Sequence, residues 1–251
     1  MRVSRRADQV ELPVLAADSA TVVLKGAFNP SIFSPAWLLA QDLIGKDEFG
    51  AADVAMIQRD IATFKTGWLN LVCTNDGLQL ITDLSYEFER CRDVAIGILQ
   101  TLRHTPLAYI GINRAVHFQL DSDEAWHAIG DTLAPKDYWE DILRFPGMRV
   151  LNIQGARPDH YAGRVHVQVE PSALVPRAVF VLHNDHFGLQ TVEAQPDSRA
   201  ELTLTEPEGA IAASADRLPL ALEILSNEWA ASMSRAEEAI ARVAGLAGNR
   251  S

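Results

Sequence analysis

The segment LAYIGINRAVHFQL, residues 107–120, alternates apolar and polar side chains over nearly its whole length. In an extended chain one side is apolar and carries Ile110, Ile112, Val116, Phe118 and Leu120. The other side is polar and carries Tyr109, Asn113, His117 and Gln119. A period of two predicts a long β-strand that has one face on the core and the other toward water.

The residues before this strand predict a hairpin and a helix. Residues 68–74 and 78–82 read as strands, and Asn75-Asp76-Gly77 between them is typical of a tight turn. Apolar residues at spacings of three and four predict a helix over about 85–102. The other elements expected here are a strand at 21–28, a helix at 34–44 capped by Ser34, and a strand at 54–64.

The residues after the strand predict a helix, several strands and a second long helix. Asp121 and Glu124 resemble a capping box, and the helix they begin is expected to reach about Leu133. The final helix is expected from Pro219 to about Leu246. The strands expected between the two helices lie at 149–154, 164–169, 178–183 and 200–205.

The element order is βαβββα followed by βαββββα. It predicts an α+β fold with a mostly antiparallel sheet and helices packed on one face. We expect an N-terminal leader at residues 1–20, a first half at 21–105 and a second half at 106–251. The two halves are related by a pseudo-twofold axis, or the chain is one irregular domain whose order repeats by coincidence.

Composition narrows the class of protein. The formal net charge of −11 repels phosphate backbones, which disfavours nucleic acid as a partner. No apolar run reaches the length of a membrane helix, and no apolar signal core follows the basic residues at the N-terminus. The two cysteines, Cys73 and Cys91, lie in core-like positions, so we expect a soluble, cytoplasmic protein without disulfides.

Two resemblances can be drawn from these patterns. The stretches LAYIGINRAVHF at 107–118, VFVLHNDHF at 179–187 and NEWAASM at 227–233 resemble a sporadically distributed family of uncharacterised bacterial proteins. That resemblance implies no established activity and no functional residues. The duplicated element order resembles the TATA-box-binding-protein-like fold in topology only, and fold alone does not carry DNA binding over.

The polar face of the predicted sheet is the first candidate site. If the strands at 107–120 and 164–169 are neighbours, their polar sides form a surface able to hold a peptide, a nucleobase or a small polar ligand. The candidate ligand-binding residues are Tyr109, Asn113, His117, Arg164, His166 and Gln168. The competing interpretation is an ordinary solvated face.

A second candidate is the cluster His183, Asp185 and His186, whose imidazoles and carboxylate are ligands for a transition metal. On a strand, however, His186 points away from the other two, and the competing interpretation is a polar strand end. The chain lacks a nucleophile elbow, a phosphate-binding loop and a dinucleotide fingerprint, so no cofactor is expected.

The absence of catalytic motifs favours a non-catalytic binding or protein-interaction protein over an enzyme. Its expected partner is another protein or a small polar ligand, and self-association into a homodimer through helices or sheet edges is a further expectation. The alternative is a metal-dependent hydrolase or nuclease that uses His183, Asp185 and His186. A specific nucleic-acid binder ranks last, and would draw on Arg114, Arg149, Arg157 and Arg164.

Overall fold

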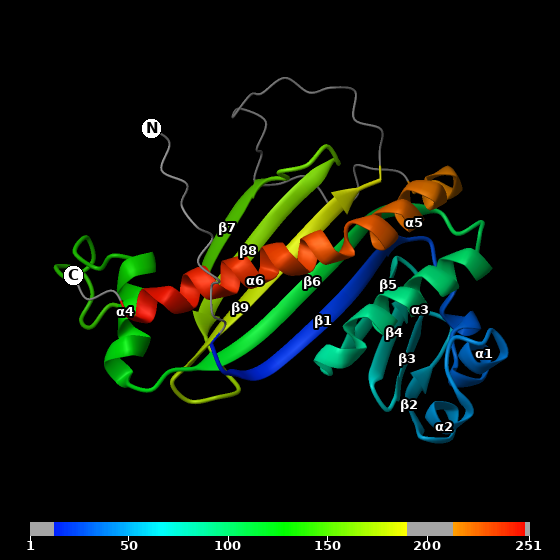
Figure 1. The fold of residues 1–251 in the computed structure, drawn as a ribbon, viewed down its shortest axis with the longest axis horizontal. Helices are drawn as coiled ribbons and strands as arrows, with labels where there is room; N and C mark the ends of the chain where they lie inside the picture. Colours follow the sequence, from blue (N-terminus) through cyan, green and yellow to red (C-terminus); the bar gives the residue numbers. More distant parts are fainter. Residues whose placement is uncertain (1–12, 190–212, 249–251) are drawn as a thin grey trace, which may run out of the picture.

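The computed structural model describes residues 13–189 and 213–248, and in these residues a nine-stranded sheet runs through the molecule (Figure 1). The strand order is β2-β3-β4-β5-β1-β6-β9-β8-β7, and all neighbouring strands are antiparallel. The strands are β1 (Leu15–Gly26), β2 (Ala52–Ile57), β3 (Ile61–Thr66), β4 (Leu69–Thr74), β5 (Gly77–Thr82), β6 (Leu107–Gln119), β7 (Leu151–Ala156), β8 (Gly163–Pro171) and β9 (Ala178–Gly188). The predicted α+β class with an antiparallel sheet is confirmed.

Helices cover one face of this sheet. Figure 1 shows α3, α5 and α6 lying across the same side of the central strands. The helices are α1 (Pro35–Ala40), α2 (Lys46–Gly50), α3 (Phe88–Thr101), α4 (Asp123–Leu133), α5 (Leu218–Asn227) and α6 (Trp229–Gly245). The described helices leave the opposite face uncovered, and we call it the open face. None of them is long and apolar enough to cross a membrane.

β6 has the buried face that the alternation of apolar and polar residues over 107–120 predicts. Ile110, Ile112, Val116 and Phe118 are fully buried under the helices. The apolar stripe of α3 is confirmed as well, because Cys91, Ala95, Ile98 and Leu99 are all fully buried. Removing these side chains from water is the main force that holds α3 on the sheet.

Several predicted boundaries are wrong, each for a local reason. The strand expected at 54–64 is a hairpin of β2 and β3, because the polar residues 58–60 form a turn in its middle. The long final helix is two helices, α5 and α6, which meet at Glu228. The helix that Ser34 caps ends at Ala40, since Asp42 takes a left-handed φ of 55°.

The start of the sheet also differs from the expectation. β1 begins at Leu15, so residues 15–20 of the predicted leader belong to the sheet. The strand expected at 200–205 lies outside the described residues.

The two predicted halves meet at the pair β1–β6. These two long strands are antiparallel, with β5 on the outer side of β1 and β9 on the outer side of β6. The first half contributes β1 to β5 and the second half β6 to β9, which form one continuous sheet. The pseudo-twofold relation between the halves stays a prediction.

Candidate functional site

A row of polar side chains crosses the open face from strand to strand. The register pairs Thr21 with Asn113, Asn113 with Asn184, Asn184 with His166, and His166 with Gln154. These five residues come from β1, β6, β9, β8 and β7, and residues paired in register project from the same face. We call them the amide row, because three of the five carry side-chain amides.

A second row runs beside the amide row. The register aligns Val23, Gly111, His186 and Arg164 on β1, β6, β9 and β8. The ring of Tyr109 lies 4.8 Å from the ring of His186, centroid to centroid, and is tilted by 40°. Gly111 leaves the floor open, and a Cβ at this position would lie only 3.3 Å from the Val23 Cβ.

All residues of these two rows except Thr21 line a cavity of about 640 Å³ on the open face. That volume lies within the range of small-molecule sites, which is roughly 300–1,000 Å³. Its polar lining residues are Lys25, Asn75, Asp76, Tyr109, Asn113, Gln154, Arg164, His166, Asn184 and His186. At one rim, the Lys25 ammonium lies 3.0 Å from the Asp76 carboxylate.

Three amide atoms in this cavity are buried without a hydrogen-bond partner in the described part of the chain. They are the oxygens Oδ1 of Asn113 and Asn184 and the nitrogen Nε2 of Gln154. A buried polar atom left unpaired costs about 1–3 kcal/mol, so native proteins keep few of them. Three that line one cavity on three strands indicate groups arranged for a ligand.

His166 sits within the amide row as a neutral group. Burial lowers the pKa of His166 below its ordinary value, which favours the uncharged imidazole near neutral pH. Its Nε2 lies 3.1 Å from the Asn152 Oδ1, so this nitrogen donates to the amide oxygen.

Four of the six predicted ligand-binding residues line the cavity: Tyr109, Asn113, Arg164 and His166. His117 and Gln168 lie on the same face but nearer the other end of the strands, and they are not part of the lining. The Nδ1 atom of His117 lies 2.8 Å from the Ser172 hydroxyl instead. The condition that the two strands are direct neighbours is not met, because β9 lies between β6 and β8.

β9 supplies the site residues that the sequence did not reveal. Asn184 and His186 lie in the cavity wall between the two predicted strands. The sequence suggested a turn or a metal ligand at these positions, whereas β9 continues through them to Gly188. The signal that could have found them is the alternation of residues 179–187, which matches that of β6.

The predicted metal cluster is divided between the two faces of the sheet. His183 and Asp185 are buried on the helix side, whereas His186 lines the cavity on the open face. Within residues 13–189 and 213–248, no three histidine, cysteine or acidic side chains are grouped closely enough to hold a metal ion. A metal-dependent hydrolase or nuclease remains an untested prediction without support from this geometry.

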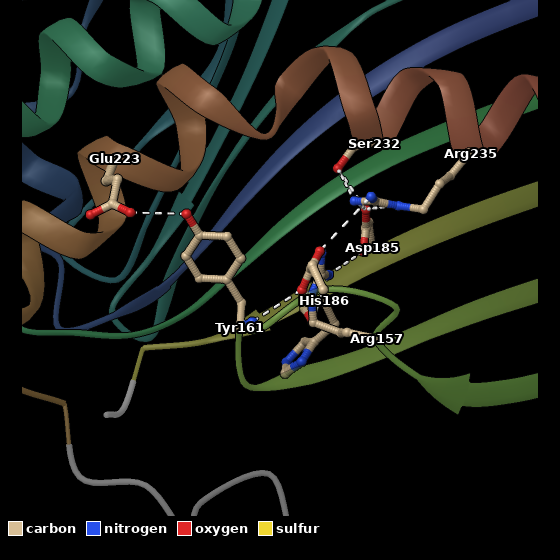
Figure 2. Close-up of polar contacts among 8 residues, drawn as sticks. Arg157, Tyr161, Asp185, His186, Glu223, Ser232 and Arg235 are labelled. Carbon is tan, nitrogen blue, oxygen red and sulfur yellow. Dashed lines mark hydrogen bonds and ion pairs between the residues drawn. The ribbon is translucent and has the colours of Figure 1, made fainter. Parts of the chain in front are cut away.

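Asp185 instead joins a buried ion network between β9 and α6 (Figure 2). Its carboxylate accepts hydrogen bonds from Arg157, from Arg235 and, at 2.6 Å, from the Ser232 hydroxyl. Arg157 also donates two hydrogen bonds to Asp159, with its Nε 2.9 Å from one carboxylate oxygen and its Nη2 2.6 Å from the other. The two arginines balance the two aspartates, as buried charges require.

The network fixes the segment between β7 and β8 under the helices. The guanidinium of Arg157 lies 3.5 Å from the centroid of the Phe187 ring, and the Tyr161 hydroxyl donates to Glu223 on α5 at 2.9 Å (Figure 2). Burial raises the pKa of Asp159, but the hydrogen bonds and charge of Arg157 outweigh it and hold this pKa below its ordinary value. We interpret this network as a structural support for the cavity wall, since Asp185 and His186 are neighbours on β9.

The network also divides the hydrophobic core into two clusters. On one side lie Ile112 and Phe187, with α3, α5, β1 and β3 to β5. On the other side lie Val116 and Val181, with α4 and the end of α6. Arg114 occupies the boundary on β6, where it binds Asp18 through two hydrogen bonds and Glu237 on α6 through a third. Arg114 and Arg157 are therefore committed to ion pairs beneath the helices, away from the open face.

Comparison of the sequence with protein-family models and with curated proteins gives no match. The inference of function therefore rests on the site itself.

Proposed function

We propose that this protein is a non-catalytic binding protein that holds a small polar ligand in the cavity on its open face. The observation that carries this proposal is the set of three buried, unpartnered amide atoms on Asn113, Asn184 and Gln154. A ligand that forms hydrogen bonds with these three atoms offsets the free-energy cost of burying them without a partner. We place this function in the cytoplasm, as the composition suggests.

The spacing of the strands defines the ligand chemistry. Neighbouring strands lie about 4.8 Å apart, so the Asn113 and Asn184 amides face a ligand at points about 5 Å apart. Gln154 lies two strands beyond Asn184, at roughly 10 Å. The site thus suits an elongated molecule with N–H donors near one end and an acceptor near the other. Amides and nitrogen heterocycles carry such groups.

Charge favours a neutral or anionic ligand. Among the described lining residues the cavity holds two cationic side chains, Lys25 and Arg164, and one acidic side chain, Asp76. A chain of net charge −11 that lines a cavity in this way lowers the energy of a negative group there relative to the rest of its surface. The rings of Tyr109 and His186, tilted by 40° to each other, add aromatic surface on which a planar group can stack.

A ligand screen with matched variants tests this proposal. Thermal-shift screening of nucleosides, nucleotides and dipeptide amides should yield compounds that raise the melting temperature of the wild-type protein. The variants N113A and N184A should lose this shift, whereas Q168A, on the same face outside the cavity, should keep it. Hits that bind N113A and N184A as tightly as wild type would place the binding site elsewhere and overturn the proposal.

A further inference from the structure

Among residues 13–189 and 213–248, the outer strands of the sheet are β2 and β7, and of these two β2 alone carries features that protect it against pairing with another chain. β2 carries Asp53 and a shift of register between Val54 and Met56, and charges and bulges are the usual protection of an edge. β7 reads LNIQGA, without a charge or a proline, and it pairs with β8 without a register shift. The outward backbone groups of β7 thus form a template for another strand.

An apolar segment leads into this unprotected strand. Its large side chains are at least half exposed: Tyr138 87%, Trp139 52%, Ile142 74%, Leu143 50% and Phe145 86%. On β7 itself, Ile153 is 56% exposed. We call β7 together with residues 138–145 the edge patch. Exposed apolar groups concentrated in this way mark an interaction surface in a soluble chain.

A hollow lies next to the protruding side chains of residues 138–145. A cavity of about 650 Å³ lies beside α4 and is lined in part by Trp126, Leu143, Phe145, Met148 and Val179. A surface that carries both an apolar hollow and exposed aromatic rings can fit a copy of itself, because each copy inserts its rings into the hollow of the other. Such reciprocity is the defining property of a twofold interface.

The charge of residues 136–156 also favours a second copy of this chain as the partner. Residues 136–156 contain three basic and three acidic side chains, so this stretch is neutral within a chain of net charge −11. Two acidic copies repel one another across most surfaces, but not across this one. An acidic chain can therefore approach its own copy at this stretch, which includes the edge patch, with little net repulsion.

We propose that the edge patch binds a second copy of this chain, with the two β7 strands paired antiparallel about a twofold axis. The pairing joins the two sheets and covers the side chains of Tyr138, Trp139, Phe145 and Ile153. This inference does not require a ligand in the open-face cavity, since it rests on the outer backbone edge of β7 and on the exposed apolar side chains beside it, although Gln154 of β7 also lines that cavity.

Analytical ultracentrifugation of the full chain tests the proposal. The wild-type protein should sediment with twice its chain mass of 27.5 kDa at micromolar concentration. The variant I153K adds a positive charge to the paired strand of each copy and removes an apolar contact, and should raise the dimer dissociation constant by a factor on the order of 100 or more. The control V54K adds the same charge to the other edge strand and should leave the dimer intact.

Cysteine cross-linking gives a second readout. The native Cys73 and Cys91 are both buried, and burial raises the pKa of each thiol to about 12, so a new surface cysteine is the reactive one. The variants N152C, I153C and Q154C should include at least one that forms a disulfide-linked dimer, whereas M56C on β2 should not. A monomeric wild-type protein, a dimer that survives I153K, or equal cross-linking at β2 and β7 would each overturn the proposal.

Discussion

Arg157 and Asp185 form an ion pair whose side chains are almost completely shielded from water, with 1% and 0% exposure. Arg157 lies in the segment between β7 and β8, Asp185 lies near the end of β9, and the two meet beneath α6, where Arg235 joins them. Because water does not reach either side chain, the charge of each residue is stabilised by its protein partners and not by solvation.

We predict that D185N destabilises the protein by roughly 3–5 kcal/mol, because it leaves the guanidinium groups of Arg157 and Arg235 without their buried counter-charge. Urea unfolding followed by circular dichroism measures this difference. The control E238Q breaks an exposed pair with Arg242 and should cost at most about 1 kcal/mol. Equal losses in the two variants would show that burial does not set the strength of the Arg157–Asp185 pair.

His183 should make the fold sensitive to mild acid. Burial lowers the pKa of His183 in the folded state below its unfolded value of about 6.5, and the charge of Asp185 only partly opposes this effect. The unfolded chain therefore takes up the proton more readily. The contribution of neutral His183 to stability is complete above about pH 6.5 and is lost as the pH falls through the lowered pKa.

The variant H183Q removes this titration, so its melting temperature should fall less between pH 7.5 and pH 5.5 than that of the wild-type protein. H104Q, at an exposed position, should follow the wild-type curve. If H183Q and wild type lose the same stability over this interval, the acid sensitivity comes from other groups.

In the amide row, a substitution that stabilises the ligand-free protein is expected to weaken ligand binding. The variant N184L replaces a buried, unpartnered oxygen with an apolar group, so it should stabilise the ligand-free protein by about 1 kcal/mol or more while abolishing the ligand-induced thermal shift. The control N152L changes an exposed asparagine whose oxygen already accepts from His166, and should not be stabilising. A loss of stability in N184L would mean that the Asn184 oxygen is satisfied within the protein.

Gly163 should be irreplaceable where β8 begins. Its φ is +123°, and a Cβ at this position would lie 2.1 Å from the backbone oxygen of His186. We expect G163A to destabilise the protein by about 2 kcal/mol or more, because the strained backbone and the clash both oppose the native register. G155A has open space around its Cβ and should change the free energy of unfolding by no more than about 1 kcal/mol. Matching unfolding midpoints for the two variants would contradict this account.

Some elements of this structure could be predicted from the sequence because a single choice of buried face fits their pattern of apolar residues. The period of two over residues 107–120 allows one face alone to be buried, and β6 buries that face in the structure. The spacing of Cys91, Ala95, Ile98 and Leu99 does the same for α3. Tyr109, Asn113, Arg164 and His166 were placed on the polar face by the same reasoning, and they line the cavity.

Other parts depend on contacts that no local pattern carries. The position of β9 between β6 and β8 is a tertiary choice, so Asn184 and Gln154 could not be assigned to the cavity beforehand. Arg157 and Asp185 are 28 residues apart, and charged residues near strand ends ordinarily face water. Their burial becomes visible only when α6 brings Ser232 and Arg235 onto the sheet.

The central position of β1 affects how this chain can fold during its synthesis. β1 precedes every other described strand, yet its two neighbours are β5 and β6, which end at Thr82 and Gln119. Until the ribosome has released β6, the first five strands have an open edge along β1, where the backbone groups that later pair with β6 have no partner strand. Such an edge can capture a strand from another nascent chain, so crowded polysomes and slow elongation before residue 119 should favour aggregation, and chaperones that shield β1 should relieve it.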